Sequence, residues 1–203
     1  MPLVGKVSSV LITARTRRRS PPLGAALPGY GDRMLSLRAM TEEDLPAVQC
    51  WLSLPHVARW WSADGPPDQV VAKYRARING TGGPTTMLTV AWAGVPIGWC
   101  QWYRWADYPA EAAAIDAQAG EVGIDYAIGD PAWTGRGAGT MLIAALAGEV
   151  RRRHPGAGIL TTPEAANTPS RRVLEKNGFH LVTVRPVATE PTDAPMAIYR
   201  LPV

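Results

Sequence analysis

The most informative stretch of the chain is Thr134-Gly-Arg-Gly-Ala-Gly139, followed at once by Thr140-Met-Leu-Ile-Ala-Ala-Leu146. Its three glycines at alternate positions let the backbone turn sharply and approach a ligand with no Cβ in the way. The apolar run behind them has helical spacing, so the loop leads into a helix N-terminus. Free N–H groups and the positive end of the helix dipole make that junction an anion site, suited to phosphate or pyrophosphate. The alternative is a turn that only joins a strand to a helix.

Ahead of this loop, Val122-Gly-Ile-Asp-Tyr-Ala-Ile128 is typical of a strand with an acid inside it. Strand, loop and helix together suggest a phosphate-bearing cofactor held beside a carboxylate. The loop is not a P-loop, because no Gly-Lys-Ser/Thr closes it. It also lacks the dinucleotide fingerprint, which stands near the first strand and has an acid about 20 residues further on.

The rest of the chain predicts an α+β fold with a mixed, mostly antiparallel central sheet flanked by helices. Thr41-Glu-Glu-Asp44 is a capping-box start for a helix that reaches about Leu52. Ala93-Gly94-Val95 predicts a tight hairpin. We expect strands at 35–40, 85–93, 96–105, 122–128, 158–162, 180–188 and 195–201, further helices at 66–79, 137–153 and 168–177, and a loop at 106–120.

The chain of 203 residues, 46% of them hydrophobic, can bury the core of one domain. Residues 1–33 hold six basic residues and one acid, which leaves 15 basic and 16 acidic residues for 34–203. The pI of 9.3 therefore reflects the N-terminal segment. We expect 1–33 to be a flexible Arg/Pro/Gly-rich extension, in preference to a nucleic-acid-binding tail, and 34–203 to be the folded domain.

Compartment and metal content follow from what the composition lacks. No apolar stretch approaches the roughly 18–20 residues that span a bilayer, so we expect no membrane partner. Cys50 and Cys100 show no metal-ligand spacing and no disulfide framework, which favours the reducing cytoplasm. His56, His154 and His180 are scattered, and we expect no metal site.

Between Trp105 and Gly135 the chain has six acids and no lysine or arginine. They are Asp107, Glu111, Asp116, Glu121, Asp125 and Asp130. A segment this one-sided sets up a negative potential that attracts a cationic substrate. For Asp116 and Glu121 we expect only a solvated loop. Asp125 differs because it lies in an apolar strand, where partial burial would raise its pKa toward that of a general base; the alternative is an acid on the strand's solvent face.

Eight tryptophans stand against one phenylalanine. Core packing is the default for tryptophan, and we expect it for Trp51, Trp92 and Trp99. The adjacent pair Trp60-Trp61 is expected outside regular structure, where one ring would offer an apolar or cation–π surface to a pocket.

These features resemble the GNAT superfamily of acetyl-CoA-dependent N-acyltransferases and, more narrowly, the aminoglycoside 6′-N-acetyltransferases. The resemblance covers about 35–200. It rests on Leu37-Arg-x-Met-Thr-Glu-x-Asp-Leu45, Trp60-Trp61, Pro96-Ile-Gly98 with Gln101, Gly123-Ile-Asp125, Gly135-Arg-Gly-Ala-Gly-Thr140, and Asn167 with Glu175-Lys176 and Gly178-Phe179.

The resemblance implies that acetyl-CoA, with no metal, lies where two central strands splay apart. Ala127 and Ile128 would pair with the pantetheine arm, Asn167 would lie near the thioester, and Lys176 would complete the cofactor site. The pyrophosphate would be held by Gly135, Arg136, Gly137, Ala138, Gly139 and Thr140.

The resemblance also implies an acceptor site for a polycationic amine. Asp125 would contact the amine and take its proton, either directly or through water. The expected lining residues are Trp60, Trp61, Trp102, Asp107, Glu111, Thr162 and Glu164. Thr162 stands where the resistance enzymes have an acid, and Glu164 is a possible substitute. Leu174 stands where a tyrosine commonly protonates the leaving thiolate, so water, Ser170 or Tyr126 would take that step.

We therefore predict a cytoplasmic N-acetyltransferase, monomeric or homodimeric, that acts on a cationic amine by direct transfer in a ternary complex. The 6′-amine of aminoglycosides is favoured. The alternatives are a lysine-type amine or siderophore precursor as acceptor, or a non-catalytic acyl-CoA-binding module.

Overall fold

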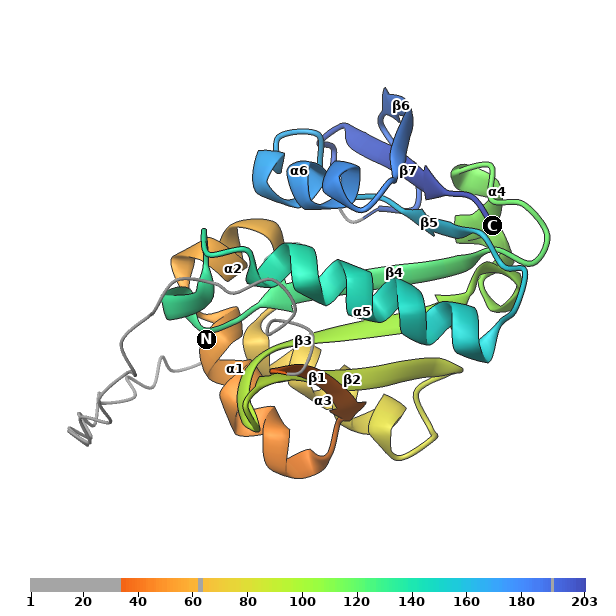
Figure 1. Cartoon of the computed structure of the whole chain (residues 1–203). Helices are drawn as coiled ribbons and strands as arrows, with labels where there is room; N and C mark the ends of the chain where they lie inside the picture. The colour runs from red at the N-terminus through yellow and green to blue at the C-terminus, as the bar shows by residue number, and fades with distance from the viewer. Residues whose placement is uncertain (1–33, 62–63, 191) are drawn as a thin grey trace, which may run out of the picture.

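The computed structural model describes residues 34–61, 64–190 and 192–203 (Figure 1). The expected extension at 1–33 lies outside these residues. The strands are β1 (Leu35–Ala39), β2 (Thr85–Trp92), β3 (Val95–Arg104), β4 (Val122–Ile128), β5 (Ile159–Thr161), β6 (His180–Arg185) and β7 (Met196–Leu201). The helices are α1 (Leu45–Leu52), α2 (Pro55–Trp61), α3 (Pro67–Ile78), α4 (Pro109–Ala114), α5 (Ala138–Arg153) and α6 (Thr168–Lys176), with short 3₁₀ helices at Glu42–Asp44, Trp105–Asp107 and Pro131–Trp133.

The described strands form one sheet in the order β1-β2-β3-β4-β5-β7-β6. Every neighbouring pair is antiparallel except β4 and β5, which are parallel. The predicted α+β class with a mostly antiparallel sheet is confirmed.

Helices cover both faces of this sheet, because β2 and β3 carry consecutive buried side chains, which point alternately to its two faces. On one face α5 packs through Leu142, Ile143 and Leu146, with α6 beside it (Figure 1). On the other face α1, α2 and α3 bury a second cluster around Trp99. None of the helices in the described ranges has the length and hydropathy that a bilayer span requires.

The central strands β4 and β5 separate soon after they meet. Their pairing is limited to Val122 with Ile159 and Gly123 with Leu160. From Ile124 to Ile128, β4 stays paired with β3 on one edge, while its other edge has no strand partner among the described residues. The sheet therefore opens into a wedge, and the open edge of β4 faces it.

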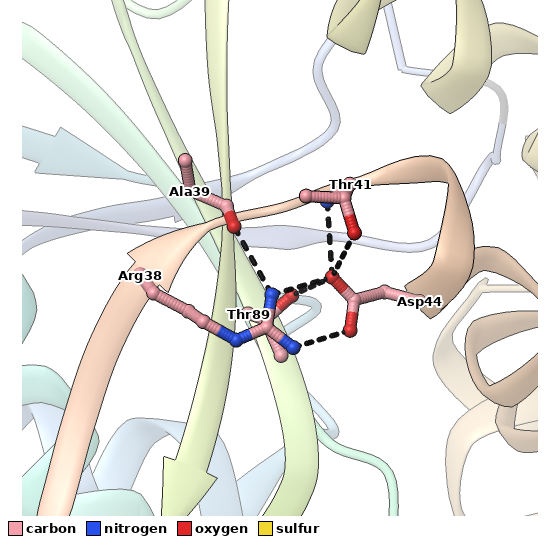
Figure 2. Close-up of polar contacts among 5 residues, drawn as sticks. All are labelled: Arg38, Ala39, Thr41, Asp44 and Thr89. Carbon is pink, nitrogen blue, oxygen red and sulfur yellow. Dashed lines mark hydrogen bonds and ion pairs between the residues drawn. The ribbon is translucent and has the colours of Figure 1, made fainter. Parts of the chain in front are cut away.

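The capping box at 41–44 is confirmed, and it anchors the first helical segment to the sheet. The Asp44 carboxylate accepts hydrogen bonds from the Thr41 backbone N–H (3.0 Å) and from the Thr89 hydroxyl of β2 (2.8 Å). Arg38 of β1 donates both terminal nitrogens to it, at 2.6 and 2.7 Å (Figure 2). Burial opposes ionisation of Asp44, but the combined effect of these hydrogen bonds and the Arg38 charge is larger and lowers its pKa to about 2.

Two helices lie where we predicted irregular chain. Trp60 and Trp61 end α2, which begins at Pro55 directly after α1. The segment 106–120 contains α4, which is only six residues long and too alanine-rich to show an apolar stripe. The hairpin at 93–95 is confirmed, with positive φ at Ala93 (47°) and Gly94 (81°) as a tight turn of this kind requires.

Candidate active site

Asp125 lies on β4 directly opposite Gln101 of β3. The two side chains share one face of the sheet, and the Gln101 Nε2 donates a 2.6 Å hydrogen bond to Oδ2 of Asp125. The Gln101 Oε1 in turn accepts a 2.7 Å hydrogen bond from Nη1 of Arg77, on the last turn of α3. Strand register and one helix thus bring three polar side chains into a line.

The surroundings of Asp125 raise the pKa of its carboxyl group, so the neutral form is more stable here than it is in water. Burial raises the pKa of this carboxyl above its ordinary value, against the lowering effect of the Gln101 hydrogen bond. The charge of Asp64 also raises the pKa, and the charges of Arg77 and Lys73 lower it. A carboxylate with a raised pKa has the basicity that an amine-deprotonating group needs.

Asp125 opens into a cavity of about 490 Å³ between α3, the sheet and the connection that precedes β7. Of the expected site residues, the cavity is lined by Trp60, Trp61, Glu111, Asp125, Thr162, Glu164 and Asn167. Residues far apart in sequence are therefore brought together at one site. Its volume suits a small-molecule ligand.

The charge of this cavity is predominantly negative. Its carboxylates are Asp64, Glu111, Asp125, Glu164 and Glu190, and its basic residues are Lys73 and Arg77. Lys73 is paired at 4.0 Å with Asp64. A concave surface with this excess of acids concentrates cations.

In addition to the expected Glu164, Glu190 brings to the cavity a carboxylate that the sequence did not predict. It comes from the β6–β7 connection, and the Thr162 hydroxyl donates a 3.3 Å hydrogen bond to its Oε1. Burial and the negative charge of Asp125 raise the pKa of Glu190. The negative charges of Asp125 and Glu190 therefore repel each other within one cavity.

The two tryptophans of the pair have different neighbours. The Trp61 ring packs against buried Trp99, with ring centroids 5.4 Å apart. The Arg59 guanidinium lies 4.6 Å from the ring centroid of Trp60. Both tryptophans line the cavity, and one of the Trp60 faces already holds a cation.

Two expected acceptor-site residues lie elsewhere. Trp102 points to the opposite face of β3 from Gln101, because neighbouring residues of a strand alternate, and it packs against the α5 core. Its ring lies 4.9 Å from that of His154 in a T-shaped pair. Asp107 is held by Arg104 at 2.7 Å, and both residues line a separate hollow with Trp102. We therefore remove Trp102 and Asp107 from the acceptor site.

In the folded protein, basic residues from elsewhere in the chain neutralise part of the charge of the acidic segment. Asp116 is exposed, as expected, and pairs with Arg185 at 2.8 Å. Glu121 is buried and forms a 2.6 Å ion pair with Arg200 of β7, so the prediction that it is solvated is wrong. Of the six acids only Glu111 and Asp125 line the cavity.

The glycine loop leads into α5 as predicted. A 3₁₀ turn at Pro131–Trp133 and a turn over 134–137 precede the helix, whose N-cap is Gly137 with φ of 87°. Gly135 also has positive φ, at 71°, a conformation that favours glycine. Within the described residues no side chain caps this N-terminus, so its first N–H groups remain available to an anion.

The wedge is flanked on its other side by α6. Asn167 caps α6 by accepting a 3.2 Å hydrogen bond from the Ser170 N–H. The Tyr126 hydroxyl of β4 lies 2.6 Å from Ser170 Oγ, and burial raises the Tyr126 pKa. Leu174 is fully buried in the core, while Lys176 is exposed near the C-terminal end of α6.

An α+β sheet that splays between its parallel strands, with a glycine-rich turn before the following helix and a carboxylate on the splayed strand, defines a class of acyl-transfer enzymes. The family model described as "Acetyltransferase (GNAT) domain" matches residues 40–185 of this chain. The chain belongs to the GNAT acetyltransferase family.

Two characterised relatives are named for different acceptors. The chain is 28% identical over 186 residues to the lysine N-acyltransferase MbtK of Mycobacterium tuberculosis, covering 91% of this chain and 83% of that protein. It is also 28% identical over 148 residues to the aminoglycoside N(6′)-acetyltransferase type 1 of Klebsiella pneumoniae, covering 71% and 73%. The structure of AAC(6′)-Ib with ribostamycin and coenzyme A superposes with a TM-score of 0.68 at 25% identity, over 83% of this chain and 93% of that one.

Sequence reasoning missed the contribution of α3 and of the β6–β7 connection. Val70, Lys73, Tyr74 and Arg77 line the cavity at helical spacings of three and four, a pattern visible in the sequence. Glu190 carries no such signal, because its connection has no periodicity and its place depends on how β6 and β7 pair.

Proposed function

We propose that this protein is an acetyl-CoA-dependent N-acetyltransferase whose acceptor is a polycationic amine, with the 6′-amine of aminoglycosides favoured. The observation that carries the proposal is Asp125, set in an acid-rich cavity beside the open edge of β4. The chain's membership of the GNAT family supports acetyl-CoA as the donor. Its similarity to an aminoglycoside acetyltransferase whose structure contains ribostamycin and coenzyme A supports both the donor and the acceptor.

The donor site would be built from backbone. The N–H groups at 135–140 would hold the pyrophosphate, because this end of α5 has positive-φ glycines and no side-chain cap among the described residues. Ala127 and Ile128 lie on the unpartnered edge of β4, where an extended pantetheine arm could add as a strand would. Asn167 borders both the wedge and the cavity, near the expected thioester.

The acceptor site would recognise more than one ammonium group. Asp125 would contact the reacting amine, and Glu190 and Glu111 would bind other ammonium groups of the same molecule. The rings of Trp60 and Trp61 would pack against its sugar faces. A molecule with a single amine would use only part of this surface.

Acetyl-CoA supplies an acetyl group that is already activated as a thioester. An ammonium ion has no lone pair, so Asp125 would first take a proton from the bound amine, directly or through one water. The amine nitrogen then bonds to the acetyl carbon as the carbon–sulfur bond breaks, and it loses its second proton to the departing sulfur through the proton donor of that step or through water. A backbone N–H of 126–128 would polarise the carbonyl. Holding both substrates in line supplies most of the acceleration.

The departing thiolate needs a proton, and Leu174 has none to give. The hydrogen-bonded pair Tyr126 and Ser170 borders the wedge between β4 and α6, so one of these hydroxyls or a water would donate the proton to the thiolate.

We infer that the enzyme works in the cytoplasm, where acetyl-CoA is made and where the free thiols of Cys50 and Cys100 are stable.

A lysine-type amine is the second candidate acceptor. It is favoured by the MbtK match, which covers more of this chain than the aminoglycoside match does. Lys73 and Arg77 in the cavity could hold the carboxylate of an amino acid.

The test is thiol release from acetyl-CoA with a panel of acceptors: kanamycin- and tobramycin-type aminoglycosides, lysine and Nε-hydroxylysine. We expect turnover with the aminoglycosides at a kcat/KM at least tenfold above that for the lysine compounds. The reverse order would establish the second candidate, and no turnover with any aminoglycoside would refute the favoured acceptor.

A further inference from the structure

The guanidinium of Arg77 is tied to the candidate base through one amide. Its Nη1 donates to the Gln101 Oε1 at 2.7 Å, and the Gln101 Nε2 donates to Oδ2 of Asp125 at 2.6 Å. Gln101 is buried, with 5% of its surface exposed, so water does not compete for these positions.

The orientation of the Gln101 amide follows from chemistry. A guanidinium has only donors, so the oxygen of Gln101 must face Arg77 and its NH₂ group must face Asp125. An ionised Asp125 has only acceptors, so it also attracts the Gln101 NH₂ group, whereas a protonated Asp125 could donate to the Gln101 oxygen and be stabilised as the neutral acid. Because Arg77 holds that oxygen, the Gln101 amide supports the ionised carboxylate and not the neutral acid.

Arg77 has no competing acidic partner in the part of the chain that the structure describes, since no ion pair forms to it there. It lies one turn beyond Lys73 and Tyr74 on the α3 face that lines the cavity. The guanidinium is 5.9 Å from the Tyr74 ring centroid, which helps to hold it over the sheet.

We propose that Arg77 is a positioning residue for Asp125: by holding the oxygen of Gln101, it directs the Gln101 NH₂ group at the Asp125 carboxylate and keeps that carboxylate ionised and aimed into the acceptor cavity. The role of Asp125 as base belongs to the proposed function, but the Arg77–Gln101–Asp125 relay stands without it. The other titratable groups coupled to Asp125 are Asp64, Lys73, Tyr74, Tyr103, Tyr126 and Glu190.

The test is a direct titration of Asp125 by ¹³C NMR of the full chain labelled at aspartate carboxyls, with its signal assigned from its loss in Asp125→Asn. Arg77→Met is expected to raise the Asp125 pKa by about one unit or more, from the lost charge and the lost amide orientation together. Lys73→Met is the matched control, since Lys73 lies on the same helix and affects Asp125 by charge without contacting Gln101.

A double-mutant cycle separates relay from charge. In a Gln101→Leu background, Arg77→Met should shift the Asp125 pKa no more than Lys73→Met does. Equal shifts with and without Gln101 would overturn the relay. The acid limb of the kcat/KM profile should move with the NMR titration; a protein that titrates as expected but transfers no acetyl group would refute the proposed function and leave the relay intact.

If Arg77→Met does not fold, a comparison of Arg77→Lys with Arg77→Gln tests the same proposal. Lysine keeps a charged donor for Gln101 and should leave the Asp125 pKa near that of the wild type. Glutamine, which can turn either of its amide atoms toward Gln101, should raise it. Indistinguishable titrations in these two variants would contradict the proposal.

Discussion

Gln101 and Asp125 are directly opposed in the register of β3 and β4, and their side chains share a 2.6 Å hydrogen bond in the wall of an acid-rich cavity. The partner that Asp125 has is therefore decided by strand pairing. Burial leaves this acid with a raised pKa, and the hydrogen bond limits the rise. A raised pKa suits the base that we propose, because it increases the affinity of the carboxylate for the proton of the amine.

Asp125→Asn should lower kcat at least tenfold with little change in the acetyl-CoA dissociation constant. Asparagine keeps the shape and the partner but cannot take a proton. Steady-state kinetics and calorimetric titration of acetyl-CoA measure the two quantities. Asp116→Asn is the control, because Asp116 is an exposed acid of the same segment, and wild-type turnover in Asp125→Asn would show that Asp125 is not the base.

The same substitution should stabilise the fold at neutral pH. The folded-state pKa of Asp125 lies above its unfolded value, so its contribution to stability is present at low pH and is lost as pH rises through the folded-state pKa. The free energy of unfolding of Asp125→Asn should therefore exceed that of wild type by more at pH 7 than at pH 4. A gap that shrinks toward neutral pH would have the wrong sign. Urea denaturation at both pH values decides.

Asp44 has the opposite sign. Its pKa of about 2, below the ordinary 3.8, corresponds to about 2 kcal/mol of stability that is present above pH 4 and is lost as pH falls through 2. Asp44→Asn should cost about that much at pH 7, and the difference should narrow to roughly half by pH 3. Glu43→Gln, an exposed neighbour, should change little. A pH-independent difference would show that the charge of Asp44 is not the cause.

Glu190→Gln should raise KM for a polyamine acceptor about tenfold while changing kcat little, because Glu190 would bind a non-reacting ammonium group. Glu164→Gln tests whether the neighbouring cavity acid shares this role, and Glu43→Gln, which lies outside the cavity, is the control. If KM in Glu190→Gln equals that of the control, Glu190 does not contact the acceptor.

Gly137→Ala should weaken acetyl-CoA binding several-fold. A Cβ there meets nothing within 4 Å, so the effect comes from φ of 87°, which costs an alanine about 1 kcal/mol or more. Gly148→Ala, in the middle of α5, should instead add up to about 1 kcal/mol of stability and leave acetyl-CoA affinity unchanged. An unchanged dissociation constant in Gly137→Ala would remove this loop from the cofactor site.

The order of the strands, the four longer helices and the loop before α5 can be predicted from the sequence, because they depend on local signals such as glycine spacing, the 41–44 capping box and strand alternation. The short helices α2 and α4 cannot be predicted in this way, because neither shows an apolar periodicity. The sequence does not predict the burial of Glu121, because its partner Arg200 lies 79 positions away and a local count of charges does not include it. Trp102 was misassigned although its strand parity, opposite to that of Trp99 and Trp105, already set it on the other face. Glu190 and Arg77 enter the site only through tertiary packing.

The central claim, transfer to the 6′-amine of an aminoglycoside, is tested most directly by a matched pair of acceptors. Neomycin and paromomycin differ in carrying an amine or a hydroxyl at the 6′ position. We predict thiol release from acetyl-CoA with neomycin, a product one acetyl group heavier, and no release with paromomycin above the rate without acceptor. Equal release with both, or none with either, would contradict the assignment.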